Sequence, residues 1–339
     1  MTQVYRIDRI QEYRKAGPTD LIELLPAPNR NQLYLPKWLL EVLTSAVCRH
    51  QCIHISGPTG SAKSSLLEAL NHRQDNFRRL CEACGFPPLP LHLHAIEMAT
   101  FETPGELYLR RALRDGTTFD EPSRLVHALE AAVATQGQAY PLIWLREMGR
   151  VRSASVQGGL LDLVTKGEII LPDGRRIDGH GIAWVADSNY QAEQDSTHTL
   201  VTFDDALRRR FAVNLTLDHL SAQQEAEVLR RLHPSAAARS LTPQEAELVD
   251  KVVKLGLLIR SQRAEGNLQT VVPPTIYGYL AFLDMARSLP HLSPQQVAVV
   301  TLLGNAGSED RNAVQVILNQ VWGIQAAAAE GATGVQNLF

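Results

Sequence analysis

Short runs of aliphatic and β-branched residues recur up to about residue 218, and the segments between them have helical spacing. The strand candidates are residues 51–56, 91–98, 141–146, 181–187 and 212–218. Residues 37–49 and 63–73 instead place apolar side chains three and four positions apart, as one face of a helix requires. Strands that alternate with helices predict a parallel sheet covered on both faces. The fold class that we expect is therefore α/β, with a doubly wound parallel sheet as its core.

The pattern changes near residue 220, after which one amphipathic helix follows another. The predicted helices are residues 221–232, 243–262, 273–289, 293–303 and 310–323. Such a run without strands predicts a separate all-α domain. The domain organisation that we expect is an N-terminal extension over 1–30, an α/β core over 31–219, a helical lid domain over 220–324 and a flexible tail over 325–339.

Composition adds limits rather than a function. The chain has 339 residues, 45% hydrophobic and 20% charged, which is enough for two domains with buried cores. It has no run of about 18 apolar residues, and its first segment is too charged for a signal peptide, so we expect a cytoplasmic protein without a membrane partner. A net charge of -3 and a pI near 6.4 argue against a surface that attracts nucleic acid everywhere, although a local basic pore would not alter these totals.

Four cysteines raise the question of a metal. Cys48, Cys52, Cys81 and Cys84 form one C-x3-C and one C-x2-C pair. Against a zinc site, Cys52 opens an apolar strand and Cys48 ends a predicted helix, so the two pairs need not converge. Reduced thiols are the favoured interpretation, and the sequence alone leaves zinc open.

A glycine-rich turn joins the strand at 51–56 to the helix at 63–73. The candidate phosphate-binding residues are Gly57, Pro58, Thr59, Gly60, Ser61, Ala62, Lys63, Ser64 and Ser65. They follow the Walker A pattern G-x-x-x-x-G-K-[ST], except that Ala62 replaces the last glycine. In such a loop, backbone N–H groups surround phosphate oxygens, Lys63 reaches the β- and γ-phosphates, and the Ser64 hydroxyl ligates Mg²⁺. The expected ligands are ATP and Mg²⁺, and the Ala62 methyl is a small perturbation if its φ is negative.

Phosphate loops that end in Ala-Lys-Ser resemble those of the AAA+ branch that contains the MoxR-like ATPases, the RavA-type ATPases and the MCM helicases. In that branch an apolar strand ends in Asp-Glu, the next strand ends near an Asn, and an Arg precedes a Phe before the last strand. The corresponding residues here are Glu147, Asn189 and Arg210, whereas Arg146 stands in place of the Walker B aspartate.

The resemblance implies a role for each of these side chains. Glu147 would polarise the attacking water, unless it only caps the turn that follows its strand. Arg146 would repel Mg²⁺ and slow turnover, unless a carboxylate is recruited from elsewhere or Arg146 itself contacts a phosphate. Asn189 would act as sensor 1, with Ser188 as its nearest alternative and a simple turn residue as the plainer interpretation.

Arg210 would be the arginine finger that reaches into a neighbouring subunit, with Arg209 as the alternative. The run Arg208–Arg210 would otherwise be a solvated basic turn. The branch usually has a sensor-2 arginine where this chain has Thr275, and Arg260 and Arg263 are weak substitutes one helix earlier.

Residues 168–181 predict a β-hairpin around Pro172-Asp173-Gly174. A hairpin before sensor 1 is typical of the superclade named after this pre-sensor-1 β-hairpin, where it commonly projects toward a central pore. Lys166, Arg175 and Arg176 would then meet a substrate chain, or would only aid solubility on an ordinary surface hairpin.

The resemblance as a whole implies a catalytically active ATP hydrolase, a MoxR-like AAA+ ATPase that assembles as a ring, expected to be a hexamer. Such proteins remodel or activate a partner protein, often one with a von Willebrand factor A domain. A nucleotide-dependent assembly scaffold or switch with weak hydrolysis is the first alternative, which Arg146 and the missing sensor-2 arginine favour. A motor on nucleic acid is the second alternative and is not favoured, because it needs a basic pore.

Overall fold

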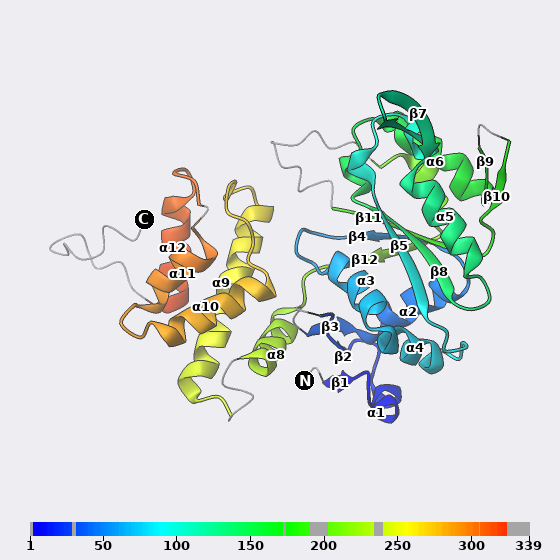
Figure 1. Cartoon of the computed structure of the whole chain (residues 1–339). Helices are drawn as coiled ribbons and strands as arrows, with labels where there is room; N and C mark the ends of the chain where they lie inside the picture. The colour runs from blue at the N-terminus through cyan, green and yellow to red at the C-terminus, as the bar shows by residue number, and fades with distance from the viewer. Residues whose placement is uncertain are drawn as a thin grey trace. The chain divides into compact units, whose positions relative to one another are not determined.

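The chain forms two compact units, Gln3–His219 and Leu220–Phe339. The computed structural model shown in Figure 1 describes residues 3–28, 32–171, 174–189, 203–233, 240–304 and 306–323. Each unit has a hydrophobic core of its own. The tail predicted over 325–339 lies outside the described residues.

The first unit is built on a parallel five-stranded sheet. Its strands are β4 (Cys52–Ser56), β5 (Leu91–Glu97), β8 (Tyr140–Arg146), β11 (Ala183–Ser188) and β12 (Val213–Thr216). They lie in the order β12-β4-β11-β8-β5, and every neighbouring pair is parallel. β11 therefore lies between β4, which leads into the phosphate loop, and β8, which ends at Arg146. All five strands agree with the strands predicted from the hydrophobic pattern.

Helices cover both faces of this sheet, which confirms the doubly wound α/β prediction (Figure 1). One face carries α2 (Lys37–Cys48), α3 (Lys63–His72) and α4 (Gln74–Ala83), and the other carries α5 (Arg124–Ala134) and α6 (Ala154–Lys166). Alternate strand residues serve the two faces, as the pleat requires. Trp144 and Val185 join the α2–α4 side, whereas Ile143 and Ala186 join the α5–α6 side.

Residues from the segment 3–28 are part of this unit's core. β1 (Val4–Arg6) pairs in parallel with β2 (Leu21–Leu24), and β3 (Leu33–Pro36) pairs antiparallel with β2. Between β1 and β2 lies the short helix α1 (Ile10–Lys15). Ile7, Tyr13 and Leu24 are buried in the same cluster as α2, α3 and α4, so the segment predicted as an extension packs into the core of the first unit.

Two antiparallel hairpins interrupt the alternation of strands and helices. Between β5 and α5, after the short 3-10 turns Met98–Thr100 and Pro104–Leu107, lie β6 (Leu109–Arg114) and β7 (Thr117–Pro122). No strand was predicted in this segment, although Asp-Gly at 115–116 is a hairpin signal. β9 (Glu168–Ile170) and β10 (Arg176–Asp178) confirm the other hairpin, with Pro172 and Asp173 outside the described residues.

In its described residues the second unit has helices joined by loops and no strand, which confirms the predicted run of helices. They are α8 (Ala222–Leu232), α9 (Pro243–Ala264), α10 (Ile276–Ser288), α11 (Pro294–Leu302) and α12 (Arg311–Trp322). Ser221, Thr242 and Ser293 begin α8, α9 and α11 with capping boxes, which explains why those helices start where they do. In the described part of the chain, no helix has the length and apolar character needed to cross a membrane.

Candidate phosphate-binding site

The phosphate loop begins where β4 meets the end of β12. Leu217 donates its backbone N–H to the Ser56 carbonyl at 2.8 Å. A Cβ added to Gly57 would lie 2.1 Å from the Leu217 carbonyl oxygen, well inside van der Waals contact. Glycine at this position is therefore required by the close approach of two backbones.

The loop then reaches α3 through two residues with positive φ. Gly60 has φ of 81°, and Ala62, at the N-cap of α3, has φ of 71°. Ala62 therefore does not have the negative φ that would make its methyl group a small perturbation. A residue with a Cβ pays about 1–2 kcal/mol for this left-handed conformation, which glycine adopts freely. The departure from the Walker A pattern therefore places strain within the loop itself.

Lys63 holds the loop together from within. Its Nζ donates to the carbonyl oxygens of Gly57 and Pro58, at 2.8 Å each, and lies 3.4 Å from the Ser61 hydroxyl. Only 7% of the residue is exposed. These oxygens are neutral, so the ammonium group would exchange them for phosphate oxygens, whose negative charge adds a direct attraction between opposite charges.

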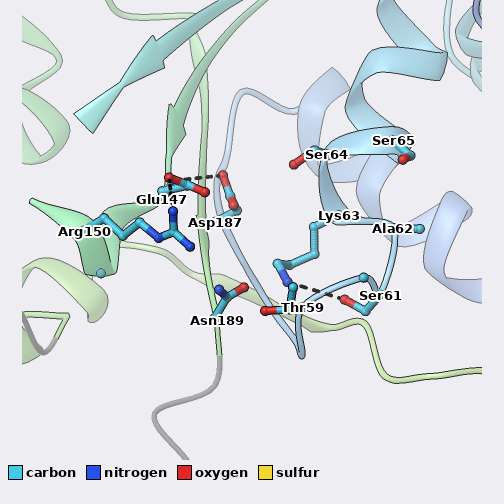
Figure 2. A pocket seen from close by; sticks show the side chains of 12 residues that line it. Thr59, Ser61, Ala62, Lys63, Ser64, Ser65, Glu147, Arg150, Asp187 and Asn189 are labelled. Carbon is cyan, nitrogen blue, oxygen red and sulfur yellow. Dashed lines mark hydrogen bonds and ion pairs between the residues drawn. The ribbon is translucent and has the colours of Figure 1, made fainter. Parts of the chain in front are cut away.

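A cavity of about 230 Å³ opens beside the loop, and its lining comes from three parts of the first unit (Figure 2). Its lining residues are Thr59, Gly60, Ser61, Ala62, Lys63, Ser64, Ser65, Glu147, Gly149, Arg150, Asp187 and Asn189. Seven of the nine predicted phosphate-binding residues are among them, and Gly57 and Pro58 instead contact Lys63 through their carbonyls.

Glu147 follows β8 in a strained backbone conformation. Its φ of 55° and ψ of 51° are left-handed, which costs a non-glycine residue of the order of 1–3 kcal/mol and is concentrated at functional sites. Its carboxylate makes no capping hydrogen bond to the turn Met148–Arg150, so the cap interpretation is not supported. Instead the Oε2 atom lies 3.4 Å from Nη1 of Arg150, and both residues line the cavity.

Arg146 is directed away from the cavity lining. Its guanidinium pairs with Glu97 at the end of β5, and its Cζ lies 4.6 Å from the centre of the Trp144 ring. It is absent from the residues that form the cavity. This placement gives no support to a direct phosphate contact, and it reduces the expected repulsion of Mg²⁺ because Glu97 neutralises the charge.

Asp187 is a second carboxylate in the cavity, beside Glu147, and it was not predicted from the sequence. It is only 4% exposed, and its Oδ1 accepts hydrogen bonds from the Trp144 indole at 2.6 Å and from the Glu147 backbone at 3.3 Å. Burial raises the pKa of Asp187, while the hydrogen bond from Trp144 and the charge of Lys63 oppose that rise. The available signal was a single acidic residue inside an otherwise apolar strand, two positions before Asn189.

The structure separates the two candidates for sensor 1. Asn189 lines the cavity directly after β11. Ser188 is buried, and its hydroxyl lies 2.8 Å from Nε2 of His54, among residues that pack on the α5–α6 side. Alternation along the strand thus sends the two polar side chains to opposite faces, and only Asn189 reaches the phosphate loop.

Arg210 lies in the turn between α7 (Asp205–Arg208) and β12, and it is exposed. It is not part of the cavity of its own chain. Arg208 pairs with Asp205 at 2.8 Å, whereas Arg209 and Arg210 have no ion-pair partner among the described residues. Both side chains are therefore available to a group outside the first unit.

The other basic candidates have partners already. Lys166 pairs with Asp162 at 3.3 Å, Arg175 pairs with Glu130 at 3.0 Å, and Arg176 pairs with Glu168. Acidic neighbours therefore neutralise the basic residues of the β9–β10 hairpin.

Arg260 and Arg263 are likewise engaged within the second unit. Arg260 makes a bidentate pair with Glu225, at 2.7 and 2.6 Å, and Arg263 donates to the Val271 carbonyl at 2.7 Å. Thr275, in the place of a sensor-2 arginine, accepts the Gly278 N–H as the N-cap of α10. These contacts explain the three residues as structural.

The cysteines do not form a common site. Cys48 and Cys81 touch with their sulfurs 3.5 Å apart on the α2–α4 side of the sheet. Cys52 packs against the cluster on the opposite side. Among the described residues, no group of three or more His, Cys, Asp or Glu side chains is arranged to hold a metal. Cys48 and Cys81 are buried, and Cys52 and Cys84 are partly buried.

Comparisons with known proteins add little beyond this geometry. No protein-family model matches the chain, and no curated protein matches it. Among solved structures, a crystal structure described as a "putative ATPase" from Cytophaga hutchinsonii ATCC 33406 is similar, with 14% sequence identity and a TM-score of 0.39. The match covers 85% of this chain and 88% of that one. A TM-score this low cannot carry a functional argument.

Proposed function

We propose that this chain is an AAA+ ATPase that binds ATP with Mg²⁺ and hydrolyses it. One observation carries the proposal: buried Lys63, the strand-end residue Glu147 and the strand-end residue Asn189 line one cavity beside a helix N-terminus. Ligands of parallel α/β sheets bind at the carboxyl ends of the strands. A helix N-terminus preceded by a glycine-rich loop is suited to phosphate because its free N–H groups and dipole favour anions.

Each side chain then has a task. Lys63 would exchange its loop carbonyls for phosphate oxygens, and the Ser64 hydroxyl would help to hold the metal. Asn189 would donate an amide hydrogen bond to the terminal phosphate. Glu147 would orient the attacking water and accept its proton. Bound Mg²⁺ supplies charge neutralisation at the phosphates; hydroxyl and carboxylate oxygens in the cavity are the hard donors that it prefers.

The direct test measures binding and turnover on the same samples. We expect Lys63→Ala to lose binding of a fluorescent ATP analogue, because the loop loses its buried cation. Glu147→Gln should keep binding and lose steady-state hydrolysis. Lys254→Ala, an exposed lysine of α9, is the matched control and should behave as wild type. Wild-type protein that binds no adenine nucleotide would refute the proposal.

The finer proposal is a MoxR-like ring, expected to be a hexamer, in which Arg210 completes the neighbour's site. It is supported by the β9–β10 hairpin ahead of Asn189 and by Arg210, which is exposed and has no ion-pair partner in the described part of the chain. In that arrangement Lys63→Ala subunits supply an intact finger and Arg210→Ala subunits supply an intact phosphate loop. Mixing the two inactive variants should therefore restore hydrolysis. A control mixture contains Arg209→Ala in place of Arg210→Ala. If hydrolysis is restored only in this control mixture, the arginine finger is Arg209.

We further propose that turnover remodels or activates a partner protein, with a protein bearing a von Willebrand factor A domain as the first class to test. Nucleic acid is the less favoured partner, because Arg175 and Arg176 are neutralised by acidic neighbours. Binding to a DNA duplex that weakens steeply with salt would reverse this order.

A nucleotide-dependent switch with weak hydrolysis is the second candidate function. The ion pair between Glu147 and Arg150 favours it, because a carboxylate held by a neighbouring guanidinium is less free to orient the attacking water. Hydrolysis by wild type that is no faster than by Glu147→Gln, together with ATP-dependent assembly, would identify the switch.

A further inference from the structure

Arg146 stands where the resembled family has an aspartate, and the neighbouring strand β11 carries an acidic residue, Asp187, close to that position. β8 and β11 are parallel, with Leu145 in register with Ala186, so Arg146 and Asp187 are the next residues on each strand. Trp144 and Val185, two positions earlier, both pack on the α2–α4 side. Asp187 therefore occupies the same face as position 146, displaced by about one strand spacing of 4.8 Å.

That displacement brings the carboxylate toward the phosphate loop. Asp187 is in register with Ile55 of β4, the strand that leads into the loop, whereas β8 is one strand further away. Asp187 and Ser64 line the same cavity, and in Figure 2 the Asp187 side chain lies between Glu147 and the loop. Arg146, in contrast, pairs with Glu97 on the far side of β8.

The contacts of Asp187 leave one oxygen uncommitted. Both hydrogen bonds that the structure gives its carboxylate, from Trp144 and from the Glu147 backbone, end on Oδ1. The residue is 4% exposed, and such burial of a carboxylate without a full set of partners is costly. Lys63 acts on Asp187 through its charge but donates its hydrogen bonds to loop carbonyls, so a cation at the cavity would compensate the rest of that cost.

We propose that Asp187 is the metal-facing carboxylate of this site, in place of the residue at position 146. With Ser64 it would hold Mg²⁺ at the nucleotide phosphates, so the inference rests on the proposed ATP binding. The donor set fits the metal, because Mg²⁺ is usually held by one or two carboxylates plus substrate phosphates rather than by a cage of protein ligands.

Arg146 has a positioning role in this arrangement. Its guanidinium stacks over the Trp144 ring at 4.6 Å, and the indole of Trp144 donates to Asp187 at 2.6 Å. The arginine in the Walker B position thus fixes the ring that orients the replacement carboxylate. Hydrogen bonds that orient a ligand from behind typically change metal affinity 10–100-fold.

The test separates metal binding from nucleotide binding. The affinity of the fluorescent analogue mant-AMP-PNP is measured in EDTA, and Mn²⁺ affinity is then measured by EPR with AMP-PNP present. Asp187→Asn keeps an oxygen acceptor for Trp144 and Glu147, so a purely structural role survives in this variant. We expect it to bind mant-AMP-PNP in EDTA like wild type and to bind Mn²⁺ at least about tenfold more weakly.

Asp162→Asn is the matched control, because it makes the same change at an exposed carboxylate of α6 that does not line the cavity. Its loss of Mn²⁺ affinity should be much smaller, and an equal loss would show a general charge effect and overturn the assignment. Unchanged Mn²⁺ affinity in Asp187→Asn would also overturn it and leave Asp187 as a positioning residue. Wild type that binds mant-AMP-PNP in neither condition would refute the ATPase proposal itself, together with this inference.

Discussion

The indole of Trp144 donates a 2.6 Å hydrogen bond to Asp187, from one buried residue of the central sheet to another. The two residues are 43 positions apart in the chain and lie on neighbouring strands, β8 and β11. The bond opposes the rise in pKa that burial imposes on the carboxyl group of Asp187. It therefore favours the charged form that a cation site needs.

Trp144→Phe tests that bond while it keeps an aromatic ring in the core. A hydrogen bond to a charged group contributes about 1.5–3 kcal/mol, so we expect a loss of about 2 kcal/mol in the free energy of unfolding in urea at pH 7. The same substitution in an Asp187→Asn background should cost only about 1 kcal/mol, because the acceptor is then neutral. Equal losses in the two backgrounds would show that the charge of Asp187 plays no part.

Ala62→Gly should stabilise the first unit, against the usual effect of glycine. The residue has φ of 71°, and removal of its Cβ relieves about 1 kcal/mol of left-handed strain. Ala131→Gly, within α5, is the control and should destabilise by about 0.5–1 kcal/mol. Chemical unfolding of both variants gives the comparison, and a loss of stability in Ala62→Gly would contradict the positive φ.

His54 should make the first unit acid-sensitive. Burial lowers its pKa from 6.5 to about 4, with Asn214 opposing and Arg208 assisting the change, and its ring contacts Ser188 and Phe203. Because the folded-state pKa is the lower one, only the unfolded chain takes up the proton between these values. The contribution of His54 to the free energy of unfolding is therefore fully present above pH 6.5. It is lost as the pH falls toward 4, by up to about 3 kcal/mol.

Unfolding in urea at pH 7 and pH 5 measures this effect, with His54→Gln as the comparison. The variant should lose less stability than wild type between the two pH values. Desolvation also lowers the pKa values of His50 and His94, which are present in both proteins, so only the difference between the two proteins reports on His54. Identical pH dependence would show that His54 is protonated in the folded state.

The pair between Arg260 and Glu225 should hold the second unit together. Their side chains are 14% and 3% exposed, and Arg260→Leu would leave a buried carboxylate without its partner. We expect a loss of about 3–5 kcal/mol in unfolding free energy. Arg230→Leu breaks an exposed pair with Asp250 and should cost no more than about 1 kcal/mol. Similar losses in the two variants would contradict the buried character of the Arg260 pair.

Most of the fold was predictable because its signals are local. Alternating and continuous apolar runs predicted all five strands of the central sheet, and helical spacing predicted the helices of the second unit. The β6–β7 hairpin was missed although Asp115-Gly116 marks its turn, because the charged residues around it obscure the strand pattern. The packing of residues 3–28 into the first unit's core depends on partners that no local pattern names.

Some residues of the candidate site were predictable from local sequence, and others were not. Gly57–Ser65, Glu147 and Asn189 were predictable because a phosphate loop and strand ends are continuous stretches of sequence. The sequence could not separate Asn189 from Ser188, since the choice depends on which strand face each side chain takes. Arg150 was missed because it becomes relevant only through its distance from Glu147.

The sequence by itself determined the order of elements and the chemistry of the phosphate loop, because both depend on residues that are neighbours along the chain. Only the tertiary structure decided that Arg146 turns to Glu97 and that Asp187 lines the cavity. Those placements follow from the register of parallel strands and from the alternation of side chains across the sheet. Register joins residues that the sequence keeps far apart, so no spacing in the chain encodes it.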